Sequence, residues 1–282
     1  MPVVSPLRSL SPADRRAVLA LLLLAAAPLA AQPPDLRVQR LTPDGEVFSD
    51  LYVEGIGPPS ISPDGRWVAY WYDGDVDDVF DLYVASRFGG DVRRISAPRP
   101  PGSDGPDSNT FRFTPDSRRV VFRIDQEDAN RTELWSVPVD GEAADAVKVS
   151  GDLAPGAEVA SDQVTPDSAW VVFGVGTASD YGLWSAPIDA SAAPVRLHPA
   201  GSDDSNGIST RLAGSTVVFN FSGAAGQPSQ LWIVPADGST PAVRVSGDLV
   251  PGGDVSSFSV TPDNARLVYR ADARFNGVDE LW

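Results

Sequence analysis

A leucine inside an apolar run recurs at a nearly constant interval through most of this sequence. The five copies are Leu82, Leu134, Leu183, Leu231 and Leu281. Their successive spacings are 52, 49, 48 and 50 residues. Four copies also have a Ser/Thr-Pro-Asp turn upstream, and two have an Asp-Gly pair downstream. Five matches to one period indicate a repeat architecture, which constrains the fold more than any other feature of the sequence.

Each repeat contains four short runs rich in Val, Ile, Phe, Tyr and Trp, separated by turn residues. Such runs favour antiparallel strands, and no unit has a stretch of helical period. Because one small sheet cannot bury both of its faces, repeated sheets stack around an axis. The sequence therefore predicts an all-β chain, a β-propeller of four-stranded antiparallel blades in which about five repeats are visible and the last is incomplete. The repeat units are expected near residues 57–96, 109–150, 160–198, 207–246 and 256–282.

Two of the repeats carry a recognisable motif. The stretch from Ser62-Pro63-Asp64-Gly65 to Ile95, and that from Thr114-Pro115-Asp116 to Ser150, resemble the WD40-like repeat of TolB-type propellers. They also resemble the N-terminal propellers of prolyl oligopeptidase-like proteins. The resemblance covers residues 38–282 and implies the fold, whereas function is open, because related propellers occur in periplasmic binding proteins, tricorn-like assemblies and peptidases.

The first 31 residues differ in composition from the rest. Arg8, Arg15 and Arg16 precede an apolar run over residues 17–31 that ends in small side chains. This run is too short for a membrane-spanning helix and is typical of a signal peptide. We therefore expect a signal peptide over residues 1–31, a short linker over 32–37 and the propeller over 38–282. The predicted localisation is periplasmic or secreted, with no membrane span after cleavage.

Both ends of the predicted propeller contain part of a repeat. Residues 38–42 (VQRLT) match the fourth strand of a unit, as in Val92–Ser96, and the fifth copy reaches only its third strand at Trp282. Two interpretations stay open. The terminal strands could complete a fifth blade together and so remove the free sheet edges. Alternatively, the chain could belong to a longer protein with further blades or another domain.

Composition excludes several classes of function. With 22 Lys and Arg against 38 Asp and Glu, the formal charge is −16, which disfavours nucleic acid as a partner. The absence of cysteine excludes thiolate chemistry, and the single histidine, His198, has no nucleophile motif nearby. We expect His198 to be a strand-end surface residue. Trp135, Trp184 and Trp232 recur at one repeat position and are expected to pack between blades. No catalytic residue is predicted.

Acidic residues gather in the loops between the second and third strands. Asp73, Asp125 and Asp272 align in the repeat, and Asp81, Glu133 and Glu280 align eight residues later. The connections between units add Asp152, Glu158, Asp162, Asp203, Asp204, Asp248 and Asp254, which predicts an acidic rim on one face. Asp73, Asp75 and Asp77 alternate as in a calcium loop, although the glycine and the final glutamate of an EF-hand are missing.

The acidic loops therefore yield candidate site residues with three open interpretations. The candidates, as calcium ligands or acidic-face residues, are Asp73, Asp75, Asp77, Asp125 and Asp272. The loops could bind Ca²⁺, attract a basic peptide or protein, or serve as a solvated surface. The function predicted is an exported, non-catalytic propeller that binds or scaffolds a protein or ligand. The alternative is the non-catalytic propeller portion of an exported prolyl oligopeptidase-like peptidase, truncated before its hydrolase domain.

Overall fold

The computed structural model describes residues 59–76, 79–89, 91–100, 111–129, 131–177, 181–198, 208–222 and 227–282. The chain divides into two compact units, residues 1–40 and 41–282, and all the described residues belong to the second. The predicted signal peptide, the linker and the strand at residues 38–42 lie outside the described residues. None of the helical turns in the described ranges is long and apolar enough to cross a bilayer.

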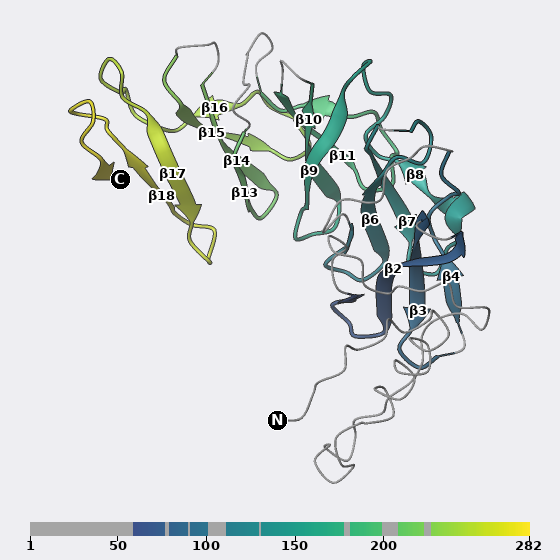
Figure 1. Cartoon of the computed structure of the whole chain (residues 1–282). Helices are drawn as coiled ribbons and strands as arrows, with labels where there is room; N and C mark the ends of the chain where they lie inside the picture. Colours follow the sequence, from purple (N-terminus) through teal and green to yellow (C-terminus); the bar gives the residue numbers. More distant parts are fainter. Residues whose placement is uncertain are drawn as a thin grey trace, which may run out of the picture. The chain divides into compact units, whose positions relative to one another are not determined.

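The described chain forms five antiparallel sheets in sequence order, and their colours run from blue to yellow in Figure 1. Sheet 1 contains β1 (Ser60–Ile61), β2 (Trp67–Val76), β3 (Val79–Ser86) and β4 (Val92–Arg94). Sheet 2 contains β5 (Phe111–Phe113), β6 (Arg119–Ile124), β7 (Glu133–Pro138) and β8 (Val147–Lys148), with a 3₁₀ turn at Ala143–Asp145. Sheet 3 contains β9 (Glu158–Val164), β10 (Trp170–Gly176), β11 (Tyr181–Pro187) and β12 (Val195–Arg196).

Sheet 4 contains β13 (Thr210–Ala213), β14 (Thr216–Phe221), β15 (Gln230–Pro235) and β16 (Val243–Arg244). Sheet 5 contains three described strands, β17 (Val255–Val260), β18 (Leu267–Ala271) and β19 (Glu280–Leu281). In every sheet, strands that follow each other in sequence are also neighbours in space. The predicted architecture is confirmed: an all-β propeller of four-stranded blades with an incomplete last repeat.

The repeat leucines occupy one structural position. Leu82 pairs with Trp71, Leu134 with Arg123, Leu183 with Gly174, Leu231 with Asn220 and Leu281 with Arg270. We call the side of each sheet that carries this leucine the leucine face. Since side chains alternate along a strand, the next residue points to the opposite side, which we call the aromatic face. Its equivalent residues are Tyr83, Trp135, Trp184, Trp232 and Trp282.

The core lies between consecutive sheets. Leu82 on the leucine face of sheet 1 shares a cluster with Phe122 on the aromatic face of sheet 2. In the same way, the leucine face of sheet 2 packs against the aromatic face of sheet 3, that of sheet 3 against sheet 4, and that of sheet 4 against sheet 5, each pair in its own cluster. Trp135 is buried in the first of these interfaces, and Trp184 and Trp232 pack against two others. Sheets 2, 3 and 4 thus bury their two faces against different neighbours.

The turns between the first two strands also connect neighbouring sheets. The fourth turn residue has a left-handed backbone in every unit: Gly65, Ser117, Ser168, Gly214 and Asn264, with φ between 56° and 70°. The hydroxyl of Ser117 accepts a hydrogen bond from the backbone N–H of Asp64 at 2.9 Å. The hydroxyl of Ser168 likewise accepts one from Asp116 at 3.0 Å. These turns therefore connect sheet 1 to sheet 2 and sheet 2 to sheet 3.

Sheet 5 differs from the others on its leucine face. Leu281 is 79 % exposed and Val268 is 37 % exposed, whereas the equivalent leucines and valines of sheets 2 to 4 are buried. The aromatic face of sheet 1, with Tyr70, Tyr72 and Tyr83, is buried. Closure of the ring through residues 38–42 stays a prediction, because that segment lies outside the described residues.

Candidate functional site

The structure gives two of the predicted calcium candidates protein partners. Asp125 forms an ion pair with Arg99 at 3.2 Å, and both side chains are buried. Asp272 accepts hydrogen bonds from the backbone N–H groups of Gly277, at 2.8 Å, and Asp254. These backbone bonds lower the pKa of Asp272, because they stabilise its ionised form.

The other three candidates are less defined. Asp73 and Asp75 lie in the backbone of β2 and Asp77 follows it, but none of their side chains belongs to the described part. Among the residues whose side chains are described, no group of three His, Cys, Asp or Glu residues is arranged to hold a metal ion. The calcium site at Asp73, Asp75 and Asp77 therefore stays a prediction.

Two of the second set of aligned acids lie beside cations on fourth strands, whereas Glu280 lies 3.7 Å from Arg274, in the loop between β18 and β19. Asp81 pairs with Arg94 at 3.3 Å, and Glu133 pairs with Lys148 at 3.2 Å. Burial raises the pKa of Asp81, opposed by Arg94, and burial raises the pKa of Glu133, opposed by Lys148. Each cation is the cross-strand partner of the aromatic residue that follows the repeat leucine, Tyr83 or Trp135.

Asp162 is not a rim residue, although its sequence position suggested one. Its side chain lies buried in β9, 2.6 Å from Arg112 and 3.2 Å from Arg123 of sheet 2. Two arginines around one carboxylate neutralise it and join sheets 2 and 3. Since Asp81, Asp125 and Glu133 are also paired with cations, the predicted acidic face has much less free negative charge than its composition indicates.

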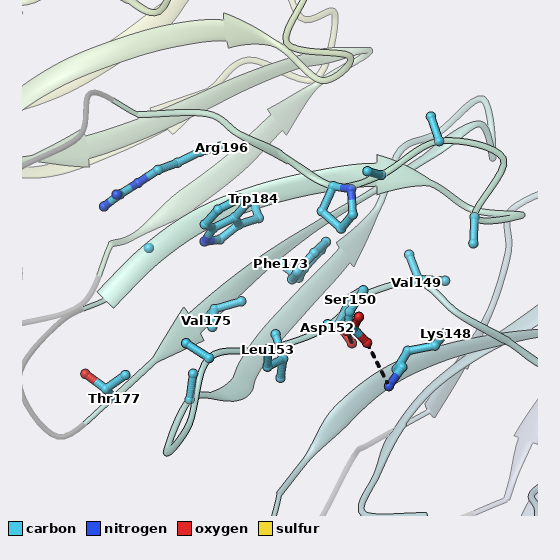
Figure 2. Close-up of a pocket in the computed structure, with 18 of the residues that line it drawn as sticks. Lys148, Val149, Ser150, Asp152, Leu153, Phe173, Val175, Thr177, Trp184 and Arg196 are labelled. Atoms are coloured by element: carbon cyan, nitrogen blue, oxygen red, sulfur yellow. Dashed lines mark hydrogen bonds and ion pairs between the residues drawn. The ribbon is translucent and has the colours of Figure 1, made fainter. Parts of the chain in front are cut away.

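A cavity of about 790 Å³ lies on the aromatic face of sheet 3. The loop that leads from β8 to β9 forms one wall, and the loop between β11 and β12 forms another. Leu153, Phe173, Val175 and Trp184 supply apolar surface. Figure 2 shows these side chains between Arg196 on one side and Lys148, which pairs with Asp152, on the other. The volume lies in the range of small-ligand pockets, so this cavity is the candidate binding site.

The two cations of the pocket differ in their surroundings. Lys148 contacts the carboxylates of Glu127, Glu133 and Asp152. Burial lowers the pKa of Lys148, but its hydrogen bonds to Glu127 and Glu133 outweigh burial and raise it. Arg196, in β12, donates one hydrogen bond to a described residue, from Nε to Nε2 of His198 at 3.1 Å. No described carboxylate forms an ion pair with Arg196.

His198 is not the surface residue that the sequence led us to expect. It is 4 % exposed, and its ring lies 4.9 Å from that of Phe221 in sheet 4. Because Nε2 accepts the bond from Arg196, the ring is in the neutral tautomer with its proton on Nδ1. The sequence analysis did not predict Arg196 as a site residue. The repeat contained a signal, because His198, the hydrogen-bond partner of Arg196, stands where other units have serine, at Ser96, Ser150 and Ser246.

Comparison with known proteins places the fold but not the family. No family model matches the chain, and no curated protein matches it. Among solved structures, a putative TolB from Agrobacterium tumefaciens is 18 % identical, with a TM-score of 0.43, and the match covers 77 % of this chain and 70 % of that one. TolB from Acinetobacter baumannii is 15 % identical, with a TM-score of 0.41, and the match covers 79 % of this chain and 55 % of that one.

Enzymes with the same fold also match. Prolyl oligopeptidase B from Galerina marginata is 15 % identical, with a TM-score of 0.49, and the match covers 79 % of this chain but only 33 % of the enzyme. Each of these structures has a TM-score below 0.5, so nothing about the role of this chain follows from the similarity. The β-propeller fold of the described residues rests on the five antiparallel sheets, and the TolB structures are similar to it.

Proposed function

We propose that this chain is exported and that its propeller is a non-catalytic binding module for a protein, peptide or small ligand. The observation that carries the proposal is the pocket on the aromatic face of sheet 3, which combines apolar side chains with the cation Arg196. A few polar groups in a mostly apolar cavity are typical of sites that bind and orient a ligand.

The surroundings of His198 support a binding role over a catalytic one. A general base must reach the proton that it abstracts. His198 is buried, and its Nε2 is occupied by the hydrogen bond from Arg196. The acids beside the pocket support the same view, because Glu133 is bound to Lys148 rather than paired with a second carboxylate.

Two measurements test the proposal. The full chain is expressed in a Gram-negative host, and mass spectrometry of the periplasmic and cytoplasmic fractions locates the processed protein. We expect cleavage close to residue 31 and recovery in the periplasm. An unprocessed cytoplasmic protein would contradict export.

The purified protein is then incubated with chromogenic prolyl peptides, the substrate class suggested by the name of one structural neighbour. We expect no turnover above the buffer blank. Turnover that copurifies with the chain and is lost in the variant His198→Ala would overturn the non-catalytic role and favour a peptidase.

A further inference from the structure

One ion pair recurs in the repeats and is missing beside the pocket. The residue that pairs with the end of the second strand is Asp81 in sheet 1, Glu133 in sheet 2, Gly182 in sheet 3 and Gln230 in sheet 4. In sheets 1 and 2 this acid binds the cation of the fourth strand, Arg94 or Lys148. In sheet 3 the acid is replaced by glycine, so no described residue at this position pairs with Arg196.

The sheet 4 equivalent shows that the loss is particular to sheet 3. Arg244 pairs across the strands with Trp232, as Arg196 does with Trp184. Although Gln230 carries no charge, Arg244 forms an ion pair with a different residue, Asp248, at 2.7 Å. Of these four equivalent cations, Arg196 alone has no carboxylate partner among the described residues.

The groups around Arg196 determine which kind of ligand could pair with it. Trp184 leans over Gly182, since a Cβ atom on Gly182 would lie 2.7 Å from the indole Nε1. His198 holds only Nε of the guanidinium, and the ring is neutral, so it does not compensate the charge. Among the described residues, the terminal nitrogens of Arg196 have no partner, so they can donate to a ligand at the edge of the pocket that Phe173, Val175 and Leu153 also line. Figure 2 shows Arg196 extending past Trp184 at one edge of the pocket, with Phe173 and Val175 on the other side of the indole ring.

We propose that the pocket binds a carboxylate attached to an apolar group, such as the C-terminus of a peptide whose last residue is apolar. The carboxylate would pair with Arg196 as Asp81 pairs with Arg94, and the apolar group would lie on Trp184, Phe173 and Val175. A guanidinium and a carboxylate can form two parallel charge-assisted hydrogen bonds, which select for a planar acid over a neutral amide. This inference rests on the proposed binding function and adds the class of ligand.

The test compares an acid with its neutral analogue. Titration calorimetry measures binding of acetyl-Ala-Ala-Ala-Phe as the free acid and as the C-terminal amide, and 3-phenylpropionate serves as a small free acid. We expect the peptide acid to bind at least about tenfold more tightly than the amide, because the amide cannot form the charged pair. Binding of 3-phenylpropionate as tight as that of the peptide acid would support the site and identify small acids as its ligands.

Variants connect the preference to one residue. Arg196→Gln removes the charge and is expected to abolish the preference for acid over amide. Arg244→Gln, at the equivalent position in sheet 4, is the matched control and should leave it unchanged. Melting temperatures near that of the parent protein establish that the variants fold.

Three results would overturn the proposal: equal affinity for acid and amide, no saturable binding of either acid, or an unchanged acid preference in Arg196→Gln. Equal affinity would leave the proposed binding function intact. A failure of export or the discovery of turnover would contradict the proposed function without affecting the acid preference. The two proposals can therefore fail separately.

Discussion

Ser168 shows how one residue contributes both to a turn and to the contact between sheets. Its φ is 60°, a conformation that costs a residue with a side chain about 1–2 kcal/mol, and its hydroxyl accepts the N–H of Asp116. We expect Ser168→Ala to destabilise the fold by about 1 kcal/mol, since it loses the bond and keeps the strain. Ser168→Gly loses the bond but relieves the strain, so it should be closer to the parent.

Chemical denaturation of both variants measures the difference. If Ser168→Gly loses as much stability as Ser168→Ala, the left-handed backbone of this turn carries no strain.

The pattern Pro-Asp-Gly/Ser predicted the turns correctly. It could not predict the hydrogen bond to the neighbouring sheet, because turn chemistry specifies local backbone geometry and not which turns are neighbours.

Asp167 gives the turns a dependence on pH. It accepts hydrogen bonds from the hydroxyl of Thr165 and, at 3.0 Å, from the N–H of Ala169. These bonds, that of Thr165 foremost, lower the pKa of Asp167 below its usual value of 3.8. A carboxyl whose pKa is lower in the folded state stabilises it above the unfolded pKa and loses this contribution as the pH falls through the folded pKa.

We therefore expect Asp167→Asn to melt below the parent protein at about pH 7, and the gap to narrow as the pH falls below the usual carboxyl pKa and through the lowered pKa of Asp167. Melting curves across this range provide the measurement. A gap that is constant with pH would mean that the ionised form of Asp167 is not what stabilises the turn.

At the scale of elements, the pairing of leucine and aromatic faces supplies most of the core. Phe219 in β14 is completely buried in the cluster between sheets 3 and 4. We expect Phe219→Ala to destabilise the fold by about 3–5 kcal/mol, because it removes buried surface and leaves a cavity. Phe275→Ala is the matched control: Phe275 is 66 % exposed, and its loss should cost less than about 0.5 kcal/mol.

Denaturant titrations of the two variants compare these values. Similar losses of stability in both variants would contradict the assignment of the core to the contacts between sheets.

The sequence allowed the strands, their order and the packing role of Trp135, Trp184 and Trp232 to be predicted, because period and residue type determine them. Trp184 also lines the pocket, which a packing argument for tryptophan does not reveal.

The candidate site was much less predictable than the fold. The acids were read as a free acidic face, yet Asp81, Asp125, Glu133 and Asp162 pair with arginines or lysine. Composition counts charges but does not show which cation lies opposite each acid across a strand pair. Arg196 became visible only when the register aligned Gly182 with Asp81 and Glu133. Arg196 differs from the equivalent cations in having no carboxylate partner among the described residues, and the sequence alone does not show which groups lie opposite it.

At the scale of the whole described molecule, stability is expected to differ from sheet to sheet, because each sheet depends on both neighbours. Sheet 3 buries its two faces against sheets 2 and 4. Sheet 5 packs one face against sheet 4, while Leu281 and Val268 on the other are exposed. A region with fewer buried apolar contacts opens at a lower free-energy cost and exposes its amides more often.

Native-state hydrogen exchange followed by mass spectrometry tests this difference. We expect peptides that span β17 to β19 to exchange faster than those that span β9 to β11, in the absence of denaturant and with the chain otherwise folded. The variant Leu231→Ala, which weakens the cluster between sheets 4 and 5, should accelerate exchange in sheet 5 more than in sheet 2. Equal protection of sheets 3 and 5 in the parent protein would mean that the exposed leucine face is covered in solution, and would direct attention to whatever packs on Leu281.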